Sequence, residues 1–258
     1  MTDQAIIVDQ IDNRSIITLN RPEVLNSLDA FMVERLHHAL DACAGSRAVV
    51  VRGAGRGFSA GRDLSNAQPL EEDARLILAD LFNPVVARLR TLPMPTIAAV
   101  HGPALGVGFG LAMACDIVVA AERSNLGSPF ANIGCVLDSG GHAALVHRVG
   151  PHRALELVYT GRLLNGQEAA AIGLVNEVVA DDKLDAYVNE LATKIANGPT
   201  AAFAASKRIV HAIADGALDF DAVLAAEADA QGELAGGHDY VEGIGAFMAK
   251  RPPQFRGR

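Results

Sequence analysis

Two glycine-rich stretches carry the clearest backbone chemistry that this sequence offers. Residues 53–63 read GAGRGFSAGRD and residues 102–110 read GPALGVGFG, and each stretch follows a short apolar run. Such loops turn sharply and leave backbone amides free to donate hydrogen bonds to an anion. Two amides that converge on one point form an oxyanion hole, which stabilises a carbonyl oxygen as it gains negative charge. The alternative for the second stretch is a tight turn that lets a helix pack closely on a sheet.

Two other uses of glycine loops fit these residues poorly. Residues 57–61, GFSAG, match the nucleophile elbow G-x-S-x-G, which requires a strand directly before the serine and a helix directly after it. Here the five residues GAGRG separate the apolar run from the motif, and residues 62–73 lack helical periodicity. His238 is a poor candidate for the histidine that would activate Ser59, because it lies in a Gly-Gly-His-Asp turn. The second stretch has Leu111 where a dinucleotide-binding loop has its third glycine. The sequence therefore argues against both chemistries.

Composition restricts the class of protein. The chain has 258 residues, of which 50% are hydrophobic and 20% are charged, as is typical of a globular protein with a large core. The formal net charge of −8 argues against a nucleic-acid-binding surface. Three cysteines without metal-ligand spacing indicate buried thiols in a reducing compartment. We find no secretion signal and no apolar run long enough to cross a membrane, so we expect a cytoplasmic protein.

Strands and helices alternate along the part of the chain that must position the loops. Apolar runs predict strands at residues 5–8, 15–19, 48–51, 96–100, 117–121 and 175–179. Helices are expected between most of these runs, including one that begins near Gly141 and breaks at Gly150-Pro151, and one capped by Asp182. Beyond Pro199 the pattern is helical to about Lys250. The alternation predicts an α/β fold with strands covered by helices.

Six stretches of the sequence follow one another in the order known from one superfamily. They are residues 19–29 (LNRPEVLNSLD), 49–64, 95–122, 132–141 (NIGCVLDSGG), 148–179 and 247–255. On these motifs the chain resembles the enoyl-CoA hydratase/isomerase (crotonase) superfamily. The resemblance implies a ClpP-like spiral core of ββα units over residues 1–197 and a C-terminal helical trimerisation region over residues 198–258.

The resemblance also implies a substrate, an assembly and a set of site residues. The substrate is a coenzyme A thioester, with no separate cofactor and no metal, and the assembly is a homotrimer or a hexamer formed as a dimer of trimers. The oxyanion-hole amides fall on Arg62 and Val107. Phe247 and Lys250 match contacts to the adenine and 3′-phosphate that a neighbouring subunit often supplies. The other implied substrate- or CoA-binding positions are Val24, Leu25, Ala60, Asp63, Leu64 and Phe130.

Two departures from the family pattern concern the catalytic acids. Typical hydratases of the family carry two glutamates that hold a water molecule and move its proton. The first position is Gly110 here, and the second, which follows Pro129, is Phe130. Since adding water across a double bond requires a base for the water and an acid for the carbon, a two-glutamate hydratase is doubtful.

One acid remains in the expected neighbourhood. Asp138 lies in IGCVLDSGG, a pattern that resembles the ring-epoxide and enoyl-CoA isomerases of phenylacetate degradation, in which one aspartate shuttles a proton. Dienoyl-CoA isomerases pair this acid with a glutamate, which is Phe130 here. The 4-chlorobenzoyl-CoA dehalogenases support it with a tryptophan and an upstream histidine, and this chain has no tryptophan. Apolar neighbours of Asp138 predict partial desolvation and a raised pKa.

Alternatives remain at Asp138 and for the whole protein. Asp138 could simply cap the helix that follows, and His142, one turn later, could tune its carboxyl group. We expect an enoyl-CoA isomerase with Asp138 as its single acid and base. The alternatives are an enoyl-CoA hydratase with an atypical water-activating group and a weakly catalytic protein that binds CoA thioesters.

Overall fold

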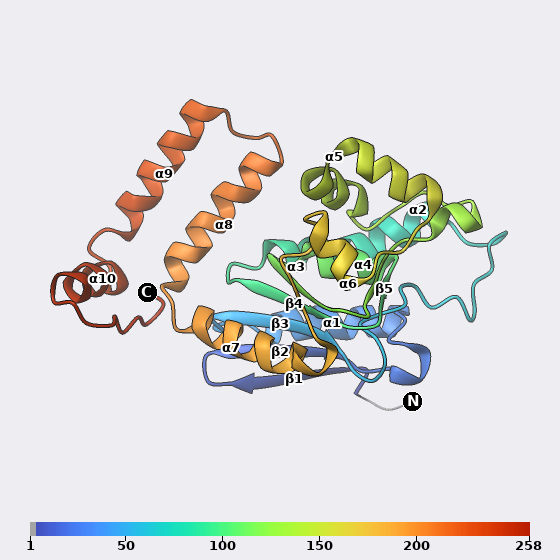
Figure 1. Ribbon diagram of the computed structural model, residues 1–258, viewed down its shortest axis with the longest axis horizontal. Coiled ribbons are helices and arrows are strands. Elements are labelled where there is room, and N and C mark those ends of the chain that lie inside the picture. The colour runs from blue at the N-terminus through green and yellow to red at the C-terminus, as the bar shows by residue number, and fades with distance from the viewer. Residues whose placement is uncertain (1–3) are drawn as a thin grey trace.

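A six-stranded sheet forms the centre of the computed structural model, which describes residues 4–258 (Figure 1). Its strand order is β1-β2-β3-β4-β6-β8, with β1 and β2 antiparallel and every other pair parallel. The strands are β1 (Ile6–Ile11), β2 (Arg14–Leu19), β3 (Ala48–Gly53), β4 (Thr96–Val100), β6 (Ile117–Ala121) and β8 (Glu177–Val179). The α/β fold predicted from the sequence is confirmed.

Helices cover both faces of this sheet because the side chains of its strands alternate between two apolar cores. Val49, Ala98 and Val118 belong to a larger core with α1 (Ala30–Ala42), α3 (Asn83–Thr91) and α4 (Val107–Ala114). Val50, Ile97 and Val119 point the other way, onto α7 (Leu184–Ala196), which overlaps β2 and β3 in the view of Figure 1. Strands buried on both faces account for the unbroken apolar runs of the sequence.

The remaining helices lie outside these two layers. They are α2 (Ala74–Leu76) with a π-helical turn at Ile77–Phe82, α5 (Gly141–Thr160), α6 (Gly166–Ala171), α8 (Thr200–Ala214), α9 (Phe220–Leu234) and α10 (His238–Met248), with short 3₁₀ turns at Pro22–Val24, Phe130–Ile133 and Asp181–Lys183. Figure 1 shows α8 to α10 extending to one side of the sheet. The division of the chain at residue 197 stays a prediction. Within residues 4–258, no helix has both the length and the apolar character needed to cross a membrane.

Three local predictions are revised by the structure. Asp182 is not a helix cap: it lies in the 3₁₀ turn before α7, whose first residue follows Lys183 without a side-chain cap. The last strand, β8, covers Glu177–Val179 only. A small second sheet of β5 (Pro103–Leu105) and β7 (Asn125–Gly127) escaped sequence analysis because three-residue strands lack a readable period. The break expected at Gly150-Pro151 is present as a kink within α5, where Gly150 has φ 77° and ψ 163°.

A partly buried ion pair joins α8 to the end of α4. The Asp116 carboxylate accepts hydrogen bonds from the Thr96 amide (2.8 Å), the Thr96 hydroxyl (3.0 Å) and Lys207 Nζ on α8 (2.9 Å). The Lys207 and Asp116 side chains are 10% and 19% exposed. Removal of one member would leave the other charge poorly solvated, which costs far more than loss of an exposed pair.

We therefore expect Lys207→Met to lower the free energy of unfolding by about 3 kcal/mol, because the buried carboxylate loses its cation. Urea unfolding followed by circular dichroism measures the change. Lys194→Met is the matched control, since Lys194 is exposed on α7. An equal effect of the two substitutions would show that the ion pair does not hold α8 in place.

Candidate functional site

The two glycine loops run side by side in parallel register. The Ser59 amide donates to the Pro103 carbonyl (2.9 Å), and the Leu105 amide donates to the Ser59 carbonyl (2.9 Å). These bonds form a parallel bridge between Ser59 and Ala104. Two residues further along each chain, Gly61 approaches Gly106, since a Cβ atom on Gly61 would lie 3.6 Å from the Gly106 Cα. The two loops predicted to act together are thus joined directly.

The loops approach so closely that a side chain fits poorly at Gly61. A Cβ atom on Gly61 would lie 2.7 Å from the Leu105 carbonyl oxygen, whereas one on Gly106 would meet the Phe130 ring at 3.1 Å and lie 4.0 Å from the Gly61 Cα. Both residues also have positive φ, 94° at Gly61 and 52° at Gly106, which glycine adopts without strain. This contact sets the separation of the residues that follow, Arg62 and Val107.

The amides of Arg62 and Val107 take no part in the hydrogen bonds that hold the loops. In the bridge between Leu28 and Arg62, the bonds are made by the Leu28 amide to Gly61 and by the Asp63 amide to Leu28. The Arg62 amide therefore points away from Leu28. Val107 is the first residue of α4, where an amide has no partner within the helix. Free amides at these two positions are what the predicted oxyanion hole requires, with the helix dipole in support at Val107, and their joint binding of one oxygen stays a prediction.

Two side chains in the first loop have structural partners. The Ser59 side chain is fully buried, and its hydroxyl donates to the Asn26 carbonyl (2.8 Å), which agrees with the argument against a nucleophilic serine. The Arg62 guanidinium pairs with the Glu72 carboxylate (2.6 Å). The backbone amide of Arg62 is thus the part of this residue that is available to a ligand.

The segment from Phe130 to Ser139 covers the start of α4 through two close contacts. A Cβ atom on Gly106 would lie 3.1 Å from the Phe130 ring, which therefore packs against the backbone next to Val107. A Cβ atom on Gly110 would lie 2.6 Å from the Ser139 Cβ and 2.5 Å from its carbonyl oxygen. Position 110 is thus filled by Ser139 and has no room for a side chain. Neither position that carries a glutamate in typical hydratases has a carboxylate.

Asp138 is half-buried next to this contact. Its Oδ1 is buried and has no hydrogen-bonding partner among residues 4–258. Burial raises the pKa of the Asp138 carboxyl above its usual range, and the nearby Ser139 hydroxyl and His142 imidazole act in the opposite direction. Ser139, the residue after Asp138, touches Gly110 one helical turn after Val107, so this contact holds the chain at Asp138 against α4. A desolvated carboxylate in this place is suited to take up and return a proton.

Asp138 does not cap the helix that follows. The N-cap of α5 is Gly140, in the left-handed conformation and without a side-chain hydrogen bond, and Asp138 contributes only its carbonyl oxygen to the Gly141 amide (2.8 Å). The alternative of a purely capping role is therefore wrong. His142 is exposed and no hydrogen bond joins it to Asp138, so its effect on the carboxyl group is electrostatic.

Five of the predicted CoA-binding positions lie together on two adjacent loop segments. The Ala60 amide donates to the Leu25 carbonyl (2.9 Å), and the bridge at Leu28 holds Asp63 beside the same turn. The Asp63 carboxylate pairs with Arg21 (3.0 Å), whereas Val24 and Leu64 are 38% and 60% exposed. These residues therefore lie near one another on two hydrogen-bonded segments of the backbone. Their binding role stays a prediction.

Phe247 and Lys250 are not brought to these two segments within one chain. Phe247 is in α10 and is 84% exposed, and Lys250 follows that helix. Figure 1 shows α10 at the far left, whereas α2 and the chain around it lie at the right. A contact of these two residues with the CoA of the same chain would require a large rearrangement, so a role for them rests on a neighbouring subunit.

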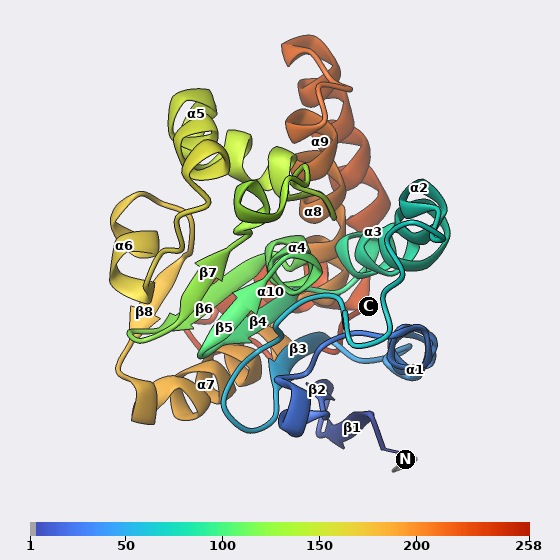
Figure 2. The same ribbon diagram turned by 90° about the vertical axis from the view of Figure 1, so that its right-hand side faces the viewer.

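A largely apolar cavity of about 760 Å³ opens beside the contact between Gly110 and Ser139. Residues of α4, α5 and α8 line it; in Figure 2, α4 lies near the centre, α8 above it and α5 at the upper left. Its wall includes Met113 and Ala143, and its far end includes the ion pair of Asp116 and Lys207. Asp138 itself does not line this cavity; the wall residue next to it in sequence is Ser139.

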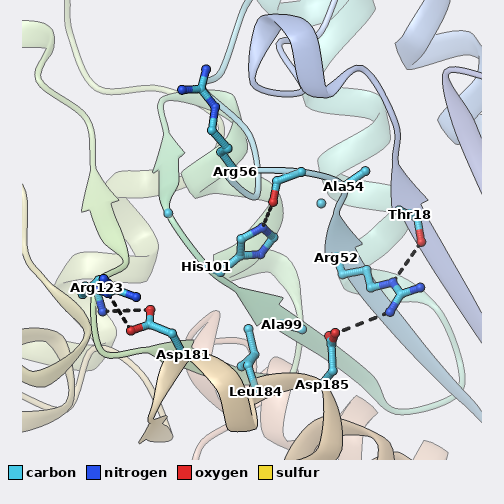
Figure 3. Close-up of a pocket in the computed structure, with 13 residues that line it drawn as sticks. Thr18, Arg52, Ala54, Arg56, Ala99, His101, Arg123, Asp181, Leu184 and Asp185 are labelled. Carbon is cyan, nitrogen blue, oxygen red and sulfur yellow. Dashed lines mark hydrogen bonds and ion pairs between the residues drawn. The ribbon is translucent and has the colours of Figure 1, made fainter.

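A second cavity of about 780 Å³ is lined by none of the predicted site residues (Figure 3). It lies where β3 and β4 end above α7, and several of its charged side chains are paired with one another. Arg123 binds Asp181 (2.8 Å), Arg52 lies 3.8 Å from Asp185, and His101 contacts the Gly55 carbonyl (3.0 Å). In residues 4–258, no group of three or more His, Cys, Asp or Glu side chains is arranged to hold a metal ion. Neither cavity is lined by a predicted site residue, but the one beside Ser139 borders Gly110 and the residue that follows Asp138.

Ser139 is the site residue that sequence analysis missed. It lies in the quoted DSGG pattern, but nothing in the sequence shows that its side chain fills the space at position 110. The residue is 4% exposed, its φ is 53°, and its Oγ has no hydrogen-bonding partner in the described chain. The feature that identifies Ser139 is its positive φ, which is unusual for a residue other than glycine and lies next to the predicted acid. A φ angle can be read only from a structure.

Comparisons with known proteins agree with this geometry. The family model described as enoyl-CoA hydratase/isomerase matches residues 12–258. A protein of Rhodobacter capsulatus named "Probable enoyl-CoA hydratase" is 39% identical over 95% of both chains. The "1,2-epoxyphenylacetyl-CoA isomerase" of Escherichia coli is 36% identical over 94% of both chains. A structure titled "putative Enoyl-CoA hydratase/isomerase" from Mycobacterium abscessus superposes with a TM-score of 0.92 at 34% identity, over 98% of this chain and 100% of that one.

The glycine-loop geometry, the sheet and these matches agree over nearly the whole sequence. The chain belongs to the enoyl-CoA hydratase/isomerase family and has the crotonase fold.

Proposed function

We propose that the protein is an enoyl-CoA isomerase in which Asp138 moves the proton. The Asp138 carboxylate removes a proton from the carbon next to the thioester of a 3-enoyl-CoA. The electron pair moves onto the thioester oxygen, where the Arg62 and Val107 amides hold the negative charge. Asp138 then returns the proton two carbons further along the chain, which leaves a 2-enoyl-CoA. One carboxylate and two amides are sufficient for this reaction.

The observation that carries the proposal is the buried, unpaired Oδ1 of Asp138 beside the start of α4. Burying a carboxylate without a partner is costly, so a position of this kind is more easily explained by chemistry than by stability. The two positions that carry glutamates in typical hydratases support the same conclusion, because Gly110 has no room for a side chain and Phe130 covers Gly106. Loss of both glutamates also fits a weakly catalytic thioester-binding protein, which the experiments below distinguish.

The proposed assembly is a trimer or a dimer of trimers. Support comes from large apolar side chains exposed on α8 to α10, namely Val210, Ile213, Phe220, Leu224, Val241, Ile244, Phe247 and Met248. So large an apolar surface on one helical region is typical of a protein interface. In such an assembly Phe247 and Lys250 would reach the CoA bound by a neighbouring chain.

Asp138→Asn tests the role of the carboxylate. We expect the rate of double-bond shift in 3-enoyl-CoA thioesters to fall by about 10²–10⁴-fold, because the amide cannot accept the proton. The reaction is followed by ultraviolet absorbance of the conjugated thioester, with Asp9→Asn on exposed β1 as the matched control. Isomerisation at the wild-type rate in the Asp138 variant would contradict the proposed mechanism. Wild-type protein that binds thioesters without turning any of them over would favour the weakly catalytic alternative.

The raised pKa of Asp138 gives a second prediction, on stability. A carboxyl group whose pKa is higher in the folded than in the unfolded protein opposes folding once it ionises. Its cost is absent below the unfolded pKa and appears as pH rises through the raised one. Asp138→Asn should therefore have an unfolding temperature at pH 7 at least equal to that of the wild type, with this relative advantage lost toward pH 3. Calorimetry across this range measures it, and a variant that is less stable only at neutral pH would contradict the sign.

Gly110 provides a third test. Gly110→Ala should lower the free energy of unfolding by about 1–3 kcal/mol and also slow isomerisation, because the new methyl group displaces Ser139 and with it Asp138. Gly110→Glu should lose isomerisation without becoming a two-glutamate hydratase. The matched control is Gly232→Ala on α9, where a Cβ atom meets nothing within 4 Å and should be neutral or stabilising. An unimpaired Gly110→Ala would show that the contact is not rigid.

A further inference from the structure

A buried arginine at the edge of the sheet is short of partners. Arg14, the first residue of β2, is 7% exposed, although arginine is rarely buried unless it is paired. Its Nη2 donates to the Asn189 side chain (2.8 Å), but its Nε is buried and has no hydrogen-bonding partner among residues 4–258. The Asp12 carboxylate lies 3.7 Å from Nη1 and its side chain is 78% exposed, so this ion pair stabilises the guanidinium little. A buried cation in this state lacks an anionic partner.

Arg14 lines a cavity of about 400 Å³ between the sheet and α7. Alternation along β2 places Arg14 and Ile16 on the face of the sheet that carries the smaller core, opposite the face that packs on α4. Most of the cavity wall is apolar and belongs to this core, with Val50 and Ala99 on the sheet and Val188 on α7. The cavity therefore lies on the other face of the sheet from α4.

The other charged groups of the wall are paired or exposed. The Arg52 guanidinium donates to the Thr18 hydroxyl (3.1 Å) and lies 3.8 Å from Asp185, as Figure 3 shows for the neighbouring cavity that shares Arg52 and Asp185. Asp9 and Asp185 are exposed, so water and salt screen their charge, and neither forms an ion pair with Arg14 in the described chain. Arg14 is thus the group of this wall that a ligand would contact.

The donors at the Arg14 end of the cavity match a carboxylate. The Asn189 side chain accepts from Arg14 through its oxygen, and its two N–H groups form no hydrogen bond within residues 4–258. A guanidinium N–H and a neighbouring amide N–H can bind the two oxygens of one carboxylate. The apolar wall beyond them fits a hydrocarbon chain and would leave the other oxygens of an inorganic phosphate without partners.

We propose that this cavity is a binding site for a short aliphatic carboxylate, held by Arg14 and Asn189 with its hydrocarbon chain between the sheet and α7. The site goes beyond the proposed isomerase reaction and shares no residue with it. The bound carboxylate supplies the anion that the buried guanidinium lacks. Because such a ligand binds only the folded chain, it also stabilises the packing of α7 on the sheet.

Hexanoate is the probe that tests the site, titrated into the full-length protein at pH 7 and followed by calorimetry. At ten times its Kd, hexanoate should raise the unfolding temperature by about 3 °C, because it binds the folded chain alone. 1-Hexanol has the same chain without the charge and should bind about tenfold more weakly or worse, since it forms no ion pair with the guanidinium. Inorganic phosphate, which has the charge without the chain, should also bind more weakly than hexanoate.

Two variants alter the donors. Arg14→Met removes the guanidinium at similar side-chain length and should weaken hexanoate binding by about tenfold or more. Asn189→Asp places a carboxylate of the chain itself beside Arg14, so it should raise the unfolding temperature by about 2 °C and abolish hexanoate binding. Asn189 is exposed on α7, so this variant should fold even where Arg14→Met does not. The matched control is Arg153→Met, which removes an exposed arginine on α5 and should leave binding unchanged.

The outcomes separate this site from the proposed function. Equal hexanoate binding by the wild type and Asn189→Asp would place the ligand elsewhere and overturn the inference. Preference for inorganic phosphate would overturn the carboxylate class, and a wild type that binds neither probe would show that water alone serves Arg14. Asp138→Asn should bind hexanoate as tightly as the wild type, whether or not the protein is an isomerase, and loss of binding in that variant would also overturn the site.

Discussion

The site depends on two loops that pack more closely than side chains would allow. Parallel hydrogen bonds at Ser59 align the loops, and the close contact of Gly61 with the Leu105 carbonyl sets their separation. Because Arg62 and Val107 follow Gly61 and Gly106, the position of their amides is fixed by backbone packing and not by the mobility of a side chain. Donors held in this way need no reorganisation when charge develops on a bound oxygen, which is the basis of electrostatic catalysis. The sheet and the helix α4 serve to hold this contact in place.

Much of the fold could be predicted because burial imposes simple patterns on sequence. Strands such as β3 and β4 are covered on both faces and therefore read as unbroken apolar runs. The predictions that were wrong concern features with little pattern. The short strands β5 and β7 contain too few residues to show a period, and the start of α7 has acidic residues that do not cap it. Local signals of this kind are easily overridden by tertiary contacts.

The candidate site was predictable only in part, for a different reason. The glycine loops and Asp138 stand out by residue type, and the structure brings both loops together and places Asp138 beside α4. The contact between Ser139 and Gly110 involves residues far apart in the sequence, and neither residue type predicts it. Likewise, only coordinates show that Oδ1 of Asp138 is buried without a partner and that Gly140, not Asp138, caps α5. Sequence identifies the candidates, whereas burial and contact decide among their roles.

The tight contact between Ser139 and Gly110 also limits how this site can change over evolutionary time. A glutamate at position 110 is incompatible with the backbone and side chain of residue 139 as they now lie, so the segment before α5 would have to move first. The two positions are therefore epistatic, and a path from this chain to a two-glutamate enzyme must pass through changes that are neutral or harmful when they first arise. In the reverse direction, once a lineage has lost the glutamate and packed residue 139 against position 110, regaining the glutamate requires a prior change at residue 139. A single packing contact thus restricts which substitutions, and so which reactions, descendants of this protein can acquire in one step.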